Sequence, residues 1–210
     1  MLCSLCSNEC QIIDTPKRKF YNCPKCDFIF VDDIHIVSQE IEKARYLNHN
    51  NNFENLGYVN MFEDFLKKTF NNDFTNIKTA LDYGCGTEPV LAKILNTKGV
   101  KTEYYDPYFF PKKIFINKKY DLIISTEVIE HIREPLKIFD LFSNHINSNG
   151  KLALMTYFHP RDKKQFLNWW YIQDITHISF YSEITIKFIA EKFGFKFLWS
   201  DGKNKILFSK

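Results

Sequence analysis

Four cysteines near the start of the chain have the spacing of a metal site. Cys3 and Cys6 form one Cys-x-x-Cys pair, and Cys23 and Cys26 form a second pair after 16 intervening residues. Each pair places two sulfurs on one side of a tight turn, and tetrahedral zinc joins two such pairs at the end of a hairpin. Because cysteine fills all four positions, we expect a structural zinc site. Cys10 is a spare cysteine, for which a loop position is favoured over a role as substitute ligand.

A glycine turn follows the apolar segment 79–83. Gly84 and Gly86 permit positive φ and let the backbone approach a ligand closely. A dinucleotide-binding turn would have a third glycine where this chain has Pro89. Asp82, just before the glycines, suits a ligand with an ammonium group and would repel a pyrophosphate. The loop therefore favours S-adenosylmethionine, which has an amino-acid end and a sulfonium, over NAD.

Two further strand-like segments end in polar residues. The first ends in Asp106, about 20 residues after the glycines, where a carboxylate can accept hydrogen bonds from ribose hydroxyls. Glu103 is the competing carboxylate, but its strand position points it sideways. The segment 120–125 delivers Thr126 and Glu127 to the same edge. Because open α/β sheets bind ligands at the carboxyl ends of their strands, we expect these loops to converge.

Asp174 and His177 are the candidate catalytic pair. A histidine near its ordinary pKa of about 6.5, oriented by a carboxylate, can act as a general base that takes a proton from a substrate. A purely structural role for both side chains in fixing the loop is equally favoured. His131 follows Glu130 and reaches the same region, where a positioning role is favoured over proton transfer.

Aromatic residues and a further histidine surround this candidate pair. Trp169, Trp170 and Tyr171 are candidates for stacking on a planar substrate, although core packing suits them equally well. Tyr157 is a further candidate substrate contact. His159, together with Asp174 and His177, is also a candidate for a second metal site. The spacing of these three residues does not decide between that site and separate positions.

Several of these runs resemble a known family. LDYGCG, YYDP and YDLIISTEVIEHIREP resemble successive motifs of class I S-adenosylmethionine-dependent methyltransferases, and FLNWWYIQDITHISFYS resembles a small bacterial subgroup with an N-terminal zinc ribbon. The resemblance covers nearly the whole chain, residues 38–70 being least distinctive. It implies a Rossmann-like sheet that ends in an antiparallel hairpin, and methyl transfer. By position it assigns the cofactor contacts to Asp82, Gly84, Cys85, Gly86, Asp106, Thr126 and Glu127.

One interval departs from the pattern of the class. Only 14 residues separate Asp106 from Asp121, where the class has a helix, a strand and the adenine-pocket loop. We therefore expect the sheet to be abbreviated at its third strand. Tyr108 or Phe109 is the expected adenine contact.

The elements that position these residues follow from periodicity and turn signals. Helices are expected at 41–47, 58–70, 90–95, 135–146 and 183–193, the last ending at Gly194. Strands are expected at 11–13, 19–21, 28–31, 79–83, 101–106, 120–125, 151–157, 195–200 and 205–209. Asn48–Asn52 is predicted to be a loop and 148–150 a turn. For the helices within 38–70, packing on the main domain is favoured over roofing of its pocket.

We divide the chain into a zinc ribbon at 1–33, a helical connecting segment at 34–75 and a methyltransferase domain at 76–210. The ribbon has too few apolar residues to fold without metal. Its paired cysteines indicate metal binding rather than disulfides in a chain that we expect to be cytoplasmic, with no signal peptide and no membrane span.

Composition limits the partners. The chain has 210 residues, 45% hydrophobic and 17% aromatic, with a formal net charge of +3. A large basic footprint for nucleic acid is absent, and the lysines at 112, 113, 118 and 119 are interpreted as a solvated face. The leading hypothesis is a methyltransferase for a small metabolite or sugar-type acceptor. The alternatives are an RNA or protein methyltransferase that docks through its ribbon, and a cofactor-binding scaffold without turnover.

Overall fold

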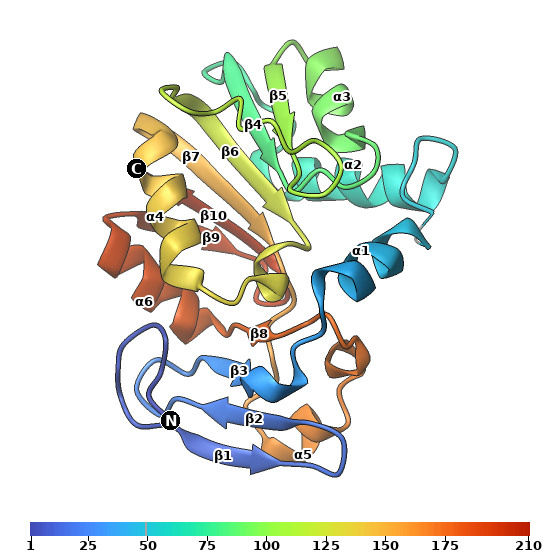
Figure 1. Ribbon diagram of the computed structural model, residues 1–210. Helices are drawn as coiled ribbons and strands as arrows, with labels where there is room; N and C mark the ends of the chain where they lie inside the picture. The colour runs from blue at the N-terminus through green and yellow to red at the C-terminus, as the bar shows by residue number, and fades with distance from the viewer. Residues whose placement is uncertain (49) are drawn as a thin grey trace.

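The computed structural model describes residues 1–48 and 50–210, and its largest element is a six-stranded sheet of order β5-β4-β6-β7-β10-β9 (Figure 1). Its strands are β4 (Thr79–Tyr83), β5 (Lys101–Tyr105), β6 (Tyr120–Thr126), β7 (Ile146–Met155), β9 (Lys196–Ser200) and β10 (Lys205–Ser209). The first four are parallel, whereas β10 is antiparallel to β7 and β9. The predicted Rossmann-like sheet with its terminal hairpin is confirmed. Within the described residues the sheet ends at β5, so its abbreviation at the third strand is confirmed too.

Helices cover both faces of this sheet because both faces are apolar. Successive residues of a strand point to opposite faces. In β6, Leu122 and Ile124 join the core beneath α2 and α3, whereas Ile123 joins the core beneath α4 and α6. These helices are α2 (Leu56–Phe70), α3 (Val90–Thr97), α4 (Pro135–His145) and α6 (Glu183–Phe193). A sheet buried on both faces leaves its strand ends as the place for a ligand.

The five predicted helices are confirmed, each with ends within two residues of those predicted. The apolar stripe of α2 is buried through Phe62, Phe65, Leu66 and Phe70. α6 begins with a capping box between Ser182 and Thr185 and ends at Gly194, whose φ is 66°. The first predicted helix is α1 (Gln39–Leu47), none of whose residues is fully buried. Within the predicted loop Asn48–Asn52, residue 49 lies outside the described residues.

The turn predicted at 148–150 is wrong, because it is part of a strand. β7 already begins at Ile146, opposite Tyr120, and its pairing resumes at Lys151 opposite Leu122. The additional residues between these pairs form an irregularity in which Asn149 has a φ of 67°. Asn149 and Gly150 are residue types common in turns, but here they form part of a bulge in β7 and the chain does not reverse.

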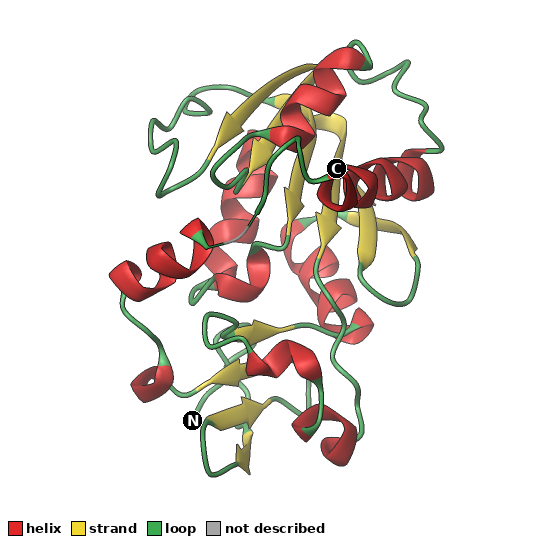
Figure 2. Cartoon of the chain, turned by 90° about the vertical axis from the view of Figure 1, so that its right-hand side faces the viewer, coloured by secondary structure: helices red, strands yellow, loops and turns green. Residues whose placement is uncertain are grey.

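A second, four-stranded sheet of order β1-β2-β3-β8 lies beyond one end of the larger sheet in both views (Figure 1 and Figure 2). It consists of β1 (Gln11–Asp14), β2 (Lys19–Asn22), β3 (Ile29–Val31) and β8 (Ser179–Phe180). The first three are the predicted ribbon strands. β8 comes from the distant C-terminal part of the chain and pairs with β3.

The ribbon also shares a core with the segment that carries β8. Phe20 and Val31 of the ribbon pack in one buried cluster with Phe166, Tyr171 and Phe180. Phe166 belongs to the short helix α5 (Lys163–Leu167). The ribbon is therefore an integral part of the fold, and β8 falls outside the predicted boundary at residue 33. In the described part of the chain, no helix is long and apolar enough to cross a membrane.

Candidate active site

The glycine loop follows β4, and its two glycines have different surroundings. Gly84 has a φ of 84°, and a Cβ there would lie 2.3 Å from Val128 Cγ2. Gly86 has a φ of 72° and nothing within 4 Å of the corresponding position. Gly84 is thus required by packing, whereas Gly86 leaves open space beside the loop.

That space belongs to a cavity of about 670 Å³, a volume typical of small-molecule sites. The cavity is lined by α1, α2, the glycine loop, the loops after β5 and β6, and the segment 170–177. Of the predicted site residues, it is lined by Gly84, Gly86, Asp106, Thr126, Glu127, His131, Trp170, Asp174 and His177. The convergence predicted for the three strand-end loops is therefore observed.

Asp106 holds two of these loops together. Its Oδ2 accepts a hydrogen bond from the Gly86 amide at 3.0 Å, and its Oδ1 accepts from the amides of Tyr108 at 2.8 Å and Phe109 at 3.1 Å. The residue is buried yet lines the cavity. Its carboxylate is thus fixed by the backbone at the end of β5.

Asp82 and Cys85 lie behind the glycine loop and do not line the cavity. Asp82 is only 2% exposed, and its Oδ2 has no hydrogen-bond partner. Burial raises the pKa of its carboxyl to about 7. Its influence on a ligand would therefore be electrostatic, through the loop rather than by contact.

Glu127 and Glu130 share the hydroxyl of Tyr171. This hydroxyl lies 3.0 Å from Glu127 Oε2 and 2.6 Å from Glu130 Oε1. Glu127 has a φ of 52°, a conformation that non-glycine residues adopt rarely and often at functional sites. Burial, and the neighbouring charge of Glu130, raise the pKa of Glu127 well above its usual range. Glu130 was not predicted to be a site residue, although the Glu-x-x-Glu-His spacing was a signal for it. Tyr171 was predicted only as a stacking residue, and no local pattern indicated its contact with the two carboxylates.

His131 and His177 lie side by side, with ring centroids 4.7 Å apart. His131 Nδ1 lies 3.0 Å from the Thr176 carbonyl oxygen, and His177 Nδ1 lies 2.9 Å from that of Tyr171. A carbonyl oxygen only accepts, so both Nδ1 atoms carry the proton and both Nε2 atoms carry a lone pair. Burial lowers the pKa of both imidazoles, that of His177 to about 4.

Asp174 lines the cavity but binds a different partner from the one predicted. Its Oδ2 accepts from Arg45 Nε at 2.8 Å and Nη2 at 2.6 Å, and its Oδ1 accepts from Thr176. Among the described residues, no hydrogen bond joins its carboxylate to His177. The Tyr171 carbonyl already satisfies His177 Nδ1, so Asp174 instead ties α1 to the loop.

The helix α1 forms one wall of the cavity. Glu42 accepts hydrogen bonds from the hydroxyls of Tyr46 and Tyr108, and the Tyr46 ring stands edge-on to His131 at 5.4 Å. Tyr58 and Met61 of α2 also line the cavity. The segment that we expected mainly to pack on the domain therefore closes the pocket as well. Its contribution was hidden because α1 makes contacts through polar and aromatic groups rather than an apolar stripe.

The aromatic candidates separate into two groups. Trp170 lines the cavity and is 60% exposed. Trp169 packs against Phe166 and Tyr171, and Tyr157 packs against Trp170 and Tyr171; neither of the two lines the cavity. Of the predicted adenine contacts, Tyr108 lines the cavity and Phe109 does not.

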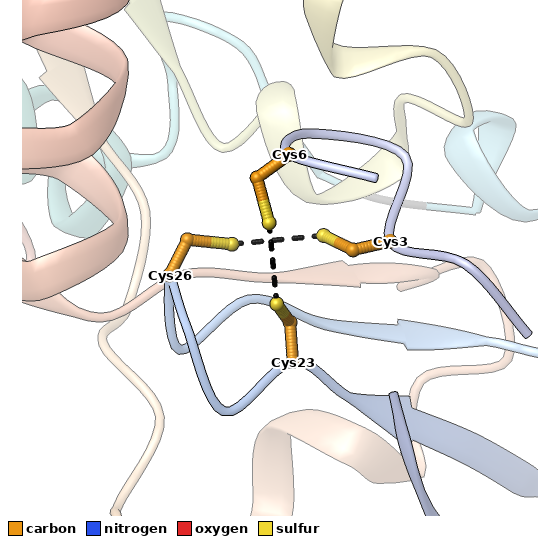
Figure 3. Close-up of side chains that lie close together, drawn as sticks. All are labelled: Cys3, Cys6, Cys23 and Cys26. Atoms are coloured by element: carbon orange, nitrogen blue, oxygen red, sulfur yellow. Dashed lines mark hydrogen bonds between the residues drawn. The ribbon is translucent and has the colours of Figure 1, made fainter. Parts of the chain in front are cut away.

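The four ribbon cysteines point toward a common centre (Figure 3). Their sulfurs all lie within 4.8 Å of one another, with 3.6 Å between Cys3 and Cys26 and 3.4 Å between Cys6 and Cys23. Four thiolates at about 2.3 Å from one tetrahedral zinc ion would be roughly 3.8 Å apart. The donor set and its spacing fit zinc.

The second metal set considered from the sequence does not assemble. His159 Nε2 lies 2.7 Å from the Asp27 carbonyl oxygen, beside the cysteine cluster. Apart from the four cysteines, the histidine and acidic side chains of the described residues form one further group with metal-ligand spacing, made of Glu130, His131 and His177.

A buried arginine connects the ribbon to this group. Arg18 Nη2 donates to the carbonyl oxygen of His177 at 2.6 Å, and Nη1 donates to those of Ile172 at 3.2 Å and Asp174 at 3.0 Å. Because the guanidinium group is rigid and planar, it holds three carbonyl groups of the segment 172–177 in fixed positions. The sequence contains no local signal for this contact.

Most of the chain matches a known protein family. Residues 47–199 match a family described as a methyltransferase domain, a span longer than half of the chain. No curated protein matches the sequence.

Solved structures share the fold at low sequence identity. Mitomycin 7-O-methyltransferase MmcR is 13% identical with a TM-score of 0.57, over 74% of this chain and 55% of that one. LaPhzM is 14% identical with a TM-score of 0.54, over 73% of this chain and 55% of that one. An O-methyltransferase family protein from Burkholderia thailandensis is 12% identical with a TM-score of 0.54, over 80% of this chain and 62% of that one. This chain thus spans less than two thirds of the length of each.

The family match, together with the glycine loop and strand order, agrees with the resemblance seen in the sequence. The chain therefore belongs to the methyltransferase-domain family.

Proposed function

We propose that this chain is a class I S-adenosylmethionine-dependent methyltransferase that transfers a methyl group to a hydroxyl oxygen of a small molecule of the metabolite or sugar type. The observation that carries the proposal is one cavity lined both by Gly86 and Asp106 and by the imidazoles of His131 and His177. Structural neighbours described as O-methyltransferases support a hydroxyl acceptor.

The cofactor side of the proposal rests on the carboxylates. S-adenosylmethionine supplies a methyl group on a cationic sulfur. Asp106 is available to the ribose hydroxyls, and Gly84 and Gly86 allow the backbone to approach the amino-acid end. Asp82, with its unpartnered buried oxygen, adds negative potential behind the loop. We assign Thr126 and Glu127 to the third cofactor loop and Tyr108 to the adenine side, while Cys85 supports the loop from behind.

The acceptor side rests on His131 and His177. Their Nε2 lone pairs form a basic centre toward which an acceptor hydroxyl can point, because the Nδ1 atoms are occupied by carbonyl groups. Trp170 offers an exposed ring against which the body of the acceptor can stack. Asp174 holds this loop through Arg45 and acts as a positioning residue.

We also propose that Cys3, Cys6, Cys23 and Cys26 bind a structural zinc ion. The support is the set of four cysteine sulfurs, which lie within 4.8 Å of one another at a spacing that fits one zinc ion. We keep the division into a ribbon at 1–33, a connecting segment at 34–75 and a methyltransferase domain at 76–210, with β8 completing the ribbon sheet.

The rival function is methylation of RNA or protein with the ribbon as a docking module. Much of the ribbon surface is engaged internally, since Phe20, Arg18 and Val31 all contact the segment 166–180. The net charge of +3 also supplies little attraction for nucleic acid. Both points favour a small acceptor.

The test is methyl transfer from cofactor labelled in its methyl group. The purified enzyme is offered small phenols and sugars that carry free hydroxyls, and in parallel total RNA and an unfolded protein. Label in a small hydroxyl compound, removed by Asp106→Ala but retained in Glu103→Ala, supports the proposal. Label in RNA, with salt-sensitive binding, would support the rival instead. Cofactor binding without transfer to any class would indicate a scaffold.

A further inference from the structure

Glu130, His131 and His177 place three potential metal ligands around one point. Each offers one ligand atom, and these atoms lie within 4.8 Å of one another. The ligands come from two places in the chain, the 3-10 turn Ile129–His131 after β6 and the loop that follows the 3-10 turn Trp170–Gln173. Such a group assembles only in the folded protein.

Both histidines are prepared as ligands by their hydrogen bonds. Their Nδ1 atoms pair with the carbonyl oxygens of Thr176 and Tyr171, which fixes each ring and leaves Nε2 with its lone pair. A metal-bound histidine usually has this second hydrogen bond from its other ring nitrogen. The orientation therefore comes from the backbone and does not depend on any ligand.

The third residue of the group, Glu130, provides a buried carboxylate. The residue is 0% exposed, its Oε1 accepts from the Tyr171 hydroxyl at 2.6 Å, and its Oε2 has no hydrogen-bond partner among the residues that the structure describes. In the described part of the chain no lysine or arginine forms an ion pair with it; the nearby Arg45 binds Asp174, and Arg18 binds three carbonyl oxygens. A buried carboxylate without a cation is costly, and a metal ion would compensate for it.

We propose that Glu130, His131 and His177 bind a divalent first-row transition-metal ion, separate from the zinc of the ribbon, with coordination positions open toward the cavity. Two imidazoles and one carboxylate suit Mn²⁺, Fe²⁺ or Zn²⁺ better than Mg²⁺ or Ca²⁺, which prefer oxygen ligands throughout. The ribbon site differs in kind, because four thiolates fill its coordination sphere.

The use of this ion in catalysis rests on the proposed function, but its binding does not. The acceptor's hydroxyl oxygen would occupy an open position, and its proton would pass to water because the cation stabilises the alkoxide. The two histidines would then hold the ion rather than take the proton themselves. Glu127, which lines the cavity and shares the Tyr171 hydroxyl, would lie beside the site.

The experiment titrates Mn²⁺ into the full chain loaded with one equivalent of zinc, which the four thiolates take up, and follows the loss of the free-ion signal by electron paramagnetic resonance. Mn²⁺ stands lowest in the affinity series and prefers nitrogen and oxygen ligands, so it does not displace zinc from thiolates. We expect one Mn²⁺ per chain. Glu130→Gln, His131→Gln and His177→Gln should each weaken binding at least about tenfold, since even loss of a supporting hydrogen bond has an effect of that size.

Two further variants and two measurements separate loss of a metal ligand from loss of the fold. His145→Gln changes a half-buried histidine outside the cavity and should leave Mn²⁺ binding unchanged. Tyr171→Phe keeps the ring but removes the hydroxyl from Glu130, and should weaken binding roughly tenfold. Each variant is checked for its zinc content and for S-adenosylhomocysteine binding, which report an intact ribbon and pocket.

The proposal is overturned if the wild-type chain binds no Mn²⁺, or if its Mn²⁺ affinity is the same in the three ligand variants. These results would leave the proposed function in place, because cofactor binding and methyl transfer are measured separately. Conversely, Mn²⁺ binding that depends on the three ligands would stand even if no hydroxyl acceptor were found.

Discussion

Arg18 Nη2 lies 2.6 Å from the carbonyl oxygen of His177. This contact joins the ribbon to the loop that presents a cavity histidine, over a separation of 159 residues in the sequence. The ribbon therefore determines where the His177 imidazole lies, although none of its own residues lines the cavity.

Replacing Arg18 tests this relationship. Arg18→Ala removes the guanidinium donor from three carbonyl groups, of which that of Asp174 also accepts from the His177 amide at 3.2 Å. The free energy of unfolding should therefore fall by about 2–4 kcal/mol. Arg18→Lys should recover only part of that loss, because one ammonium cannot reproduce the guanidinium fork. Urea denaturation measures both, with the exposed Lys17→Ala as control. Equal stability of Arg18→Ala and the control would show that the three contacts contribute nothing.

Loss of a ribbon cysteine should affect the loop that carries His177 more than the cofactor loops of the larger sheet. In Cys23→Ser the zinc ligand set is incomplete, so β3 and its partner β8 should loosen. Hydrogen–deuterium exchange should then accelerate at Ile178, whose amide donates to the Glu130 carbonyl. Affinity for S-adenosylhomocysteine should change less than about threefold, because the glycine loop and Asp106 belong to the larger sheet.

Cys10→Ser is the matched control for that experiment, since Cys10 lies outside the four-cysteine set. It should keep its zinc and its exchange pattern. A Cys23→Ser variant with unchanged protection at Ile178 would mean that the ribbon does not support the loop.

The amino-acid sequence allowed prediction of features that depend on local patterns. The Cys-x-x-Cys pairs, the glycine turn, the C-terminal hairpin and the end of α6 at Gly194 each depend on neighbouring residues, and they were located closely. The short interval between Asp106 and Asp121 also predicted the abbreviated sheet.

Features that depend on packing between distant segments were not predicted. β8 has only two residues and is a strand because β3 lies beside it. Tyr171 looked like a stacking residue, but its buried hydroxyl serves two carboxylates. The predicted Asp174–His177 pairing was inferred from their spacing in the sequence. That spacing gave no indication that Arg45 of α1 donates to the Asp174 carboxylate instead.

Gly84 offers a test of the packing at the glycine loop. In Gly84→Ala the new Cβ would lie 2.3 Å from Val128, in addition to the strain of a φ of 84°. Gly99→Ala is a matched control, since Gly99 has a φ of 85° and nothing within 4 Å. The difference between the two variants should be about 1–3 kcal/mol of unfolding free energy, the usual effect of overpacking. If urea denaturation shows the same loss of unfolding free energy in both variants, the Val128 side chain moves aside at no measurable cost.

Asp121 should give part of the stability a dependence on pH. Burial alone would raise its pKa, but hydrogen bonds from Asn147, Thr79 and the Lys78 amide lower it. A carboxyl with a lowered pKa stabilises the fold above its unfolded value of about 3.9, and that stabilisation is lost as the pH falls through the folded value. Asp121→Asn should therefore be less stable than wild type by about 1–2 kcal/mol at pH 7.

The difference between wild type and Asp121→Asn should narrow at pH 3, as measured by urea denaturation at both pH values. Asp140→Asn is the control, because Asp140 is exposed and its carboxylate accepts a hydrogen bond from one neighbouring side chain. A difference that stays constant between pH 7 and pH 3 would contradict the role given to the Asp121 charge.

We claim that carboxylates at the strand ends receive a cationic nucleoside cofactor rather than a dinucleotide. Calorimetry of S-adenosylhomocysteine and NADH with the wild-type chain, Asp106→Ala and Glu103→Ala measures this preference. We predict binding of S-adenosylhomocysteine alone, weakened at least about tenfold in Asp106→Ala and unchanged in Glu103→Ala. Tight binding of NADH with no response to S-adenosylhomocysteine, or full affinity in Asp106→Ala, would contradict the claim.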